Sequence, residues 1–161
     1  MSGAIRTGGC QCGAVRYRTV GEIGFPHLCH CRMCQKAAGN YFMPFGGVMY
    51  ENFTLTRGEP RWFRSSDTVR RGFCGDCGTP LFYDGGSDHI SITLGSLDDP
   101  SDVQPEIQTN LTQKMPWFGT LDALATDGNL DTDPEQEKVI AASSRQHPDY
   151  DTEIWPMKET Q

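Results

Sequence analysis

The sequence predicts a mainly β fold of short antiparallel strands, with a small helix and a loosely packed C-terminal extension. The first observation is a series of short apolar or alternating segments separated by glycine pairs such as Gly46-Gly47 and Gly85-Gly86. Repeated short strands with turn signals between them are typical of an all-β or β-rich domain. The second observation is that all seven cysteines fall in three tight clusters within residues 10–77. Crosslinks between such clusters would hold a compact fold together.

Five segments are predicted as strands. Residues 14–18 alternate apolar with basic side chains, which suits a strand with one solvated face. Residues 89–94 alternate cleanly, so Ile90, Ile92 and Leu94 are expected to face the core. The other three candidates are residues 41–45, 61–64 and 80–83. The first of these three carries a proline, so we place it at a sheet edge or a strand end.

Helical signals are sparse. Residues 32–38 are predicted to form one or two helical turns that end at Gly39, and a second helix is expected to begin near Pro134. The remaining tail is polar, with Trp155 as its only large anchor. We expect a partly ordered extension, since chain ends are usually loose. The alternative is an arm that packs Trp155 onto the core or onto a partner.

Charge and hydropathy exclude several classes of partner. The formal charge is −7, and residues 127–161 carry nine Asp or Glu against three Lys or Arg. This balance gives no basic face for nucleic acid, apart from five arginines between residues 57 and 71. The chain begins without an apolar run, and no stretch approaches the roughly 20 apolar residues of a membrane helix. We therefore expect a cytoplasmic protein with no membrane or nucleic-acid partner, whose thiols stay reduced and available for metal.

The cysteines are arranged as a C-x-C pair, a C-x-C-x-x-C triplet and a C-x-x-C pair. Seven is odd, so internal disulfides cannot account for all of them, and free buried thiols are the other alternative to metal. Residues i and i+2 of a strand share a face, so a C-x-C pair can aim both thiols at one ion. We predict a compact fold with two Zn²⁺ per chain, one site closed by four thiolates and one open with three. The closed, structural site is predicted to comprise Cys10, Cys12, Cys74 and Cys77, and the open site Cys29, Cys31 and Cys34.

The open site, called the tripod below, is the candidate for chemistry. Three thiolates leave one coordination position of zinc free, and such a soft ion prefers a thiol to a hard oxygen ligand. Binding would lower the pKa of a substrate thiol toward its nucleophilic form. The tripod therefore predicts chemistry between a small thiol and an electrophile. The alternative is a second structural site completed by an acid or by a histidine, the candidates being His27, His30 and His89.

Beyond single motifs, the chain resembles the glutathione-dependent formaldehyde-activating enzyme family, which includes centromere protein V-like proteins. The resemblance covers about residues 5–125. The segments that carry it are residues 9–17 (GCQCGAVRY), 29–34 (CHCRMC) and 73–83 (FCGDCGTPLFY), with further family features at 53–66 and 114–118.

The resemblance implies a compact β fold with two zincs, in which the first and last cysteine clusters hold the structural ion and the middle cluster holds the catalytic one. It also implies an activity, classed as a carbon–sulfur lyase, that joins glutathione to formaldehyde as S-hydroxymethylglutathione. Family members often have His-Ile where this chain has Glu106-Ile107, a departure that bears on the substrate more than on the metals. We divide the chain into a zinc-binding domain, residues 1–125, and an acidic extension, residues 126–161.

We therefore expect an enzyme that acts on glutathione adducts, with glutathione or another small thiol and a small aldehyde as partners. Glutathione has two carboxylates, and guanidinium groups bind carboxylates through paired hydrogen bonds, so the candidate contacts are Arg32, Arg70 and Arg71. Two other readings stay open. One is a zinc-stabilised thiol carrier or sensor without turnover. The other is a structural adaptor that reaches nucleic acid through its arginines, against which the net acidity argues.

Overall fold

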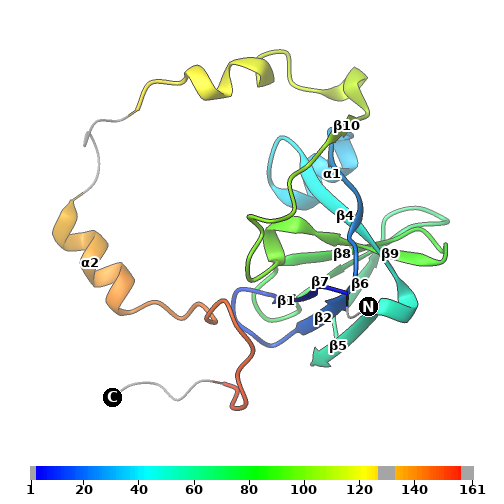
Figure 1. Ribbon diagram of the computed structural model, residues 1–161. Coiled ribbons are helices and arrows are strands. Elements are labelled where there is room, and N and C mark those ends of the chain that lie inside the picture. Colours follow the sequence, from blue (N-terminus) through cyan, green and yellow to red (C-terminus); the bar gives the residue numbers. More distant parts are fainter. Residues whose placement is uncertain (1–2, 127–132, 157–161) are drawn as a thin grey trace.

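The computed structural model describes residues 3–126 and 133–156, and within these ranges ten strands form two sheets (Figure 1). The smaller one, sheet A, has the order β1-β2-β5, with bounds Ile5–Gly9, Arg16–Val20 and Phe53–Arg57. The larger one, sheet B, has the order β10-β3-β4-β9-β8-β7-β6. Its strands in that order are Ile107–Thr109, Gly24–Cys29, Met43–Met49, His89–Thr93, Pro80–Asp84, Arg70–Phe73 and Arg61–Arg64. All neighbours are antiparallel except β10 and β3, which are parallel.

The helices are short. The α-helices are α1 (Arg32–Ala38) and α2 (Pro134–Ala142), and the 3₁₀ helices are η1 (Tyr50–Asn52), η2 (Leu94–Ser96), η3 (Leu111–Gln113) and η4 (Phe118–Ala123). Both predicted helices are therefore present, and the mainly β fold class is confirmed. Helix α1 ends at Gly39, which adopts the left-handed conformation (φ 60°) that glycine tolerates best. None of the helices in residues 3–126 and 133–156 is long and apolar enough to cross a membrane.

The predicted strands are all present, and two of them differ in informative ways. The strand expected at 14–18 lies at 16–20, because the preceding residues turn back through a hydrogen bond from the Cys10 amide to the Val15 carbonyl at 3.0 Å. The proline-containing segment is the start of β4, an interior strand. Pro44 precedes Phe45, the first residue that pairs with β9, so the proline sits at a strand end as predicted.

The hydrophobic core lies between the two sheets. Tyr17 on β2 is fully buried, and its ring meets that of Phe82 on β8 edge-on, with the centroids 5.4 Å apart. The three residues predicted to face inward, Ile90, Ile92 and Leu94, are all buried in the same cluster. This side of sheet B is therefore filled by apolar packing against sheet A.

The outer face of sheet B carries the reactive side chains. Residues paired across strands point to the same side of a sheet, and side chains alternate along each strand. By this register His27 and Cys29 on β3 share the outer face with Phe45 on β4, Tyr83 on β8 and Arg71 on β7. Cysteine and histidine from β3 and arginine from β7 are thus brought to one surface.

The C-terminal extension returns to the core after α2. Helix α2 has no buried residue, in agreement with a loosely packed extension. Beyond it, the Trp155 indole donates to the Cys12 carbonyl at 2.7 Å, and the His147 amide donates to the Gln11 carbonyl at 2.6 Å. Gly13 permits this approach, because its φ is +80° and a Cβ there would lie 2.1 Å from the imidazole ring. The expectation of a loose end is therefore wrong at Trp155, and the alternative, an arm that packs Trp155 onto the core, is the arrangement present.

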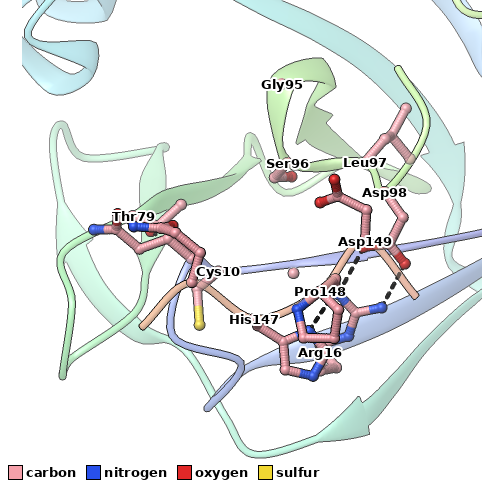
Figure 2. Close-up of a pocket in the computed structure, with 13 residues that line it drawn as sticks. Cys10, Arg16, Thr79, Gly95, Ser96, Leu97, Asp98, His147, Pro148 and Asp149 are labelled. Carbon is pink, nitrogen blue, oxygen red and sulfur yellow. Dashed lines mark hydrogen bonds and ion pairs between the residues drawn. The ribbon is translucent and has the colours of Figure 1, made fainter. Parts of the chain in front are cut away.

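A cavity of about 330 Å³ lies between the returning segment and the core (Figure 2). On its wall Arg16, only 2% exposed, donates to Asp98 at 2.8 Å and to Asp151 at 2.7 Å. Burial by itself would raise the pKa of Asp98, but hydrogen bonds from Arg16 and Thr7 outweigh it and lower that pKa below its ordinary value. Arg16, Asp98 and Asp151 are therefore already paired with one another, which indicates a structural network.

Breaking this network should have a measurable cost. We expect Asp98→Asn to destabilise the protein by about 3 kcal/mol, because it weakens the pairing of a buried guanidinium. Asp102→Asn is the matched control, since Asp102 pairs with Arg6 at 2.9 Å but is 52% exposed, and exposed pairs contribute less than about 1 kcal/mol. Urea unfolding at pH 7 measures both. Equal effects of the two substitutions would contradict the distinction.

Candidate metal centres

The four-cysteine site consists of Cys10, Cys12, Cys74 and Cys77, the same four residues that were predicted to act together. The first pair follows β1 and the second pair follows β7, and all four sulfurs lie within 4.8 Å of one another. The sulfur–sulfur separations are 3.6 Å for Cys10–Cys12 and 3.8 Å for Cys12–Cys74. Four sulfurs about 2.3 Å from a common centre in a tetrahedron would be about 3.8 Å apart. The donor set therefore fits a tetrahedral zinc ion.

Backbone amides point at the sulfurs of this site. The Val15 amide donates to Cys10 Sγ at 3.3 Å, and the Asp76 amide donates to Cys74 Sγ at 3.4 Å. Gly78, directly after the last ligand, adopts φ +78°, which lets the chain turn back around the four sulfurs. Such N–H donors stabilise thiolate sulfur, so the loops favour the charged form that metal requires.

The tripod is the second cluster, and its three sulfurs also lie within 4.8 Å of one another. Cys29 ends β3, Cys31 is the N-cap of α1, and Cys34 lies in the first turn of that helix. In residues 3–126 and 133–156 no fourth His, Cys, Asp or Glu joins the group. His30 does not complete it, because neither of its ring nitrogens belongs to this group, and its Nε2 lies 3.1 Å from the Gln108 side-chain oxygen. The described structure thus favours the open arrangement over a closed second site.

Two side chains donate hydrogen bonds to the tripod sulfurs. Arg71 Nη2 lies 3.4 Å from Cys34 Sγ, and Asn110 Nδ2 lies 3.3 Å from Cys29 Sγ. Asn110 directly follows β10, which pairs in parallel with β3, and it adopts the left-handed conformation (φ 57°) that asparagine tolerates. The sequence analysis did not identify Asn110. Its only signal was an asparagine after a very short strand.

Protonation is divided unequally among the tripod sulfurs. A hydrogen bond from Cys34 lowers the pKa of Cys29 to about 4, although burial acts in the opposite direction. The same hydrogen bond, together with burial, raises the pKa of Cys34, while Arg71 acts to lower it. The cluster therefore holds a thiolate beside a thiol whose proton a soft cation can replace. This donor set fits zinc.

The tripod opens onto a cavity of about 400 Å³ on the outer face of sheet B. Its lining includes the three cysteines, with Arg71, Asn110 and His27 as polar groups and Tyr83 and Phe45 among the apolar ones. Ligand pockets typically measure about 300–1,000 Å³ and combine apolar walls with a few polar groups. The cavity therefore has the size and the character of a small-molecule site.

The three arginines proposed to contact glutathione occupy different places. Arg71 is 8% exposed and lines the tripod cavity. Arg70 instead pairs with Asp84 at 2.7 Å and lies over the Trp62 ring, and Arg32 is exposed and donates to a neighbouring glutamine. Neither of these two lines the cavity. A contact between any of the three and glutathione stays a prediction, and the geometry singles out Arg71.

Residues 5–113 match the family described as "Glutathione-dependent formaldehyde-activating enzyme". The chain belongs to this family. The matched region holds all seven cysteines, so membership in the glutathione-dependent formaldehyde-activating family covers both candidate metal centres. Among solved structures, the crystal structure of a Rhodobacter sphaeroides protein is similar, at 19% identity and a TM-score of 0.52. The alignment covers 64% of this chain and 99% of that protein, and at this identity the likeness concerns the fold alone.

Membership confirms the resemblance read from the sequence and supports a glutathione-dependent formaldehyde-activating role.

Glu106 is the residue at which this chain departs from the histidine that family members often have. Glu106 directly precedes β10, its amide donates to the Pro26 carbonyl at 2.9 Å, and its side chain is exposed outside the lining of the tripod cavity. The departure therefore lies near the site without altering the cluster of sulfurs.

Proposed function

We propose that the chain is a zinc-dependent enzyme of the carbon–sulfur lyase type that acts on glutathione adducts, including the addition of glutathione to formaldehyde. The observation that carries the proposal is the tripod, whose three sulfurs open onto a cavity large enough for a small thiol. Family membership supplies glutathione and formaldehyde as the candidate partners. Two Zn²⁺ per chain, one at each cysteine cluster, are part of this proposal, as is the division at about residue 125.

The reaction balances without a further reactant. A bond forms between the thiol sulfur and the aldehyde carbon, the π pair of the carbonyl moves to its oxygen, and the thiol proton ends on that oxygen as S-hydroxymethylglutathione. Zinc held by Cys29, Cys31 and Cys34 would supply Lewis acidity, which favours the thiolate form of a thiol in the cavity.

Arg71 supplies positive charge where the reaction needs it. Among the described residues it forms no ion pair with a carboxylate, and its Nε has no hydrogen-bond partner. A buried cation without a partner is costly, so its position makes sense beside sulfurs that carry negative charge. Its guanidinium, which donates to Cys34 Sγ, offsets the charge of three thiolates and so favours entry of a fourth, anionic sulfur.

His27 is the candidate for moving a proton in the same cavity. Its Nδ1 lies 2.8 Å from the Phe25 carbonyl, so Nδ1 carries the proton and donates, and Nε2 is left as the basic nitrogen. An imidazole that lines the cavity can accept a proton from a thiol and return it to an alkoxide.

Glutathione binding tests the proposed function. We expect protein with quantified zinc to bind glutathione in calorimetric titration and to bind S-methylglutathione at least tenfold more weakly, because the free thiol contacts the tripod. Absence of binding at millimolar glutathione would contradict the proposed function.

A carrier without turnover is the second candidate function, since the tripod alone suffices to hold a thiol. Exchange NMR with ¹³C-formaldehyde separates the two, because only an enzyme accelerates exchange between formaldehyde and its glutathione adduct.

The contribution of Arg71 can be measured beside its neighbour. We expect Arg71→Gln to weaken glutathione binding by about tenfold to a hundredfold, since hydrogen bonds to charged groups contribute about 1.5–3 kcal/mol. Arg70→Gln is the control, because the adjacent side chain lies outside the cavity, and it should leave the affinity unchanged. Zinc content is determined for both variants. If Arg71→Gln binds zinc fully and its affinity for glutathione is unaltered, the charge of Arg71 does not contribute to thiol binding.

A further inference from the structure

A second, smaller cavity adjoins the tripod cavity. It measures about 170 Å³, and Phe45 and Arg71 line both cavities. Strand pairing places Phe63 on β6 opposite Arg71 and Phe45 opposite Thr93, so the second cavity continues along the outer face of sheet B. The two cavities therefore meet at shared side chains rather than lying on separate surfaces.

The walls of the second cavity are largely apolar. Apart from the shared Arg71, the side chains along this lining are mainly those of Ala37, Met43, Phe45, Phe63 and Phe73. The hydroxyl of Thr93, also in the lining, already donates to the Pro80 carbonyl at 2.9 Å. This space therefore offers little to a polar ligand and favours an apolar one.

Its size indicates the kind of group that would fit. An engineered apolar cavity of about 150 Å³ in another protein stays dry and binds benzene. Phe63, which is 62% exposed, forms part of the wall, so the cavity is open to entry as well as apolar. Formaldehyde has only hydrogens on its carbonyl carbon and would leave this space unfilled.

We propose that the second cavity receives the apolar substituent of a glutathione adduct, so that the substrates include adducts of apolar aldehydes of about phenyl or butyl size. This inference rests on the proposed function, which places the glutathione sulfur at the tripod. In the cleavage direction the carbon–sulfur bond of RCH(OH)–SG breaks, its electron pair goes to sulfur, and the hydroxyl proton is transferred to the sulfur. The products are glutathione and RCHO, with R seated beyond Phe45 and Arg71.

The test compares two stable thioethers in calorimetric titration of zinc-loaded protein. S-benzylglutathione carries the apolar group and S-methylglutathione lacks it, and we expect the benzyl compound to bind at least tenfold more tightly. Ala37→Leu on α1 should erase that preference, because the larger side chain fills the cavity. Lys36→Leu is the matched control, since it adds the same residue at the adjacent, exposed position outside the lining, and it should keep the preference.

A second variant approaches the cavity from the sheet. Phe63→Ala removes an exposed wall residue, which puts little of the core at risk, and it should also reduce the benzyl preference. Glutathione itself is titrated into every variant, and its affinity should not change. Equal binding of the two thioethers to the wild type, or a preference that survives Ala37→Leu, would overturn the inference while glutathione binding upholds the proposed function. Failure of glutathione to bind would instead remove the function on which the inference rests.

Discussion

Replacing Cys74 by serine should unfold most of the domain. Cys74 is 1% exposed, and its sulfur lies 3.8 Å from that of Cys12, a residue 62 positions earlier in the chain. Structural zinc contributes about 10–16 kcal/mol of apparent binding free energy in small zinc domains, which is comparable to the net stability of about 5–15 kcal/mol typical of a whole protein. Loss of one thiolate should therefore remove the ion and most of the folding free energy with it.

The measurement is far-UV circular dichroism and thermal melting, together with zinc content by mass spectrometry. Asp76→Asn is the control, because Asp76 lies within the same loop but is exposed and outside the cluster of sulfurs. Treatment of the wild type with a chelator strong enough to remove both ions should cause the same loss of fold that is expected for Cys74→Ser. A cooperative melt near the wild-type temperature in Cys74→Ser would show that the four-cysteine site is dispensable for folding.

Replacing Cys31 by serine should have the opposite profile, with loss of function and retention of fold. We expect the zinc content to fall from two ions to one, the melting transition to persist, and glutathione binding to drop by at least a hundredfold. The reason is that Cys31 caps α1 and belongs to a local cluster on the outer face of sheet B, away from the core between the sheets. Serine keeps the capping geometry, because its hydroxyl can accept the same amide hydrogen bond.

Lys36→Gln is the control for this variant, since Lys36 lies on the same helix, is exposed and stands outside the lining of the tripod cavity. It should bind two zinc ions and glutathione as the wild type does. Should Cys31→Ser keep both ions and still bind glutathione, the tripod would not be the thiol site.

The parts of the fold that local patterns determine could be predicted from the sequence. Helix α1 ends at Gly39 as expected, since glycine is the residue that accepts a left-handed turn, and the alternation in β9 correctly placed Ile90 and Ile92 in the core. The grouping of the cysteines followed from spacing, because chelating pairs leave few sensible partners. The helix end and the strand alternation used neighbouring residues, and each cysteine motif is itself local, although the four-cysteine site joins two pairs far apart in the chain.

The side chains that donate hydrogen bonds to the tripod sulfurs could not be predicted in the same way. Asn110 is 81 positions after Cys29 in the chain. It reaches that cysteine because β10, three residues long, adds to sheet B in parallel beside β3. A strand so short has no periodicity from which to infer its partner. Residues 70–73 were not among the predicted strands. In the structure Arg70 and Arg71 are consecutive in β7, so their side chains point to opposite faces and only Arg71 meets the tripod.

The two cysteine clusters are nested, and this bears on how a newly made chain matures. The tripod spans five positions, whereas the four-cysteine site closes a loop of 62 positions, from Cys12 to Cys74, that contains the tripod. Loop-closure entropy grows with the logarithm of length and disfavours the longer closure by about 2 kcal/mol. An extended chain meeting scarce zinc would thus capture its first ion at the tripod and its second only after the sheets assemble. Slow loading would then be seen at the structural site, with the reactive site filled early.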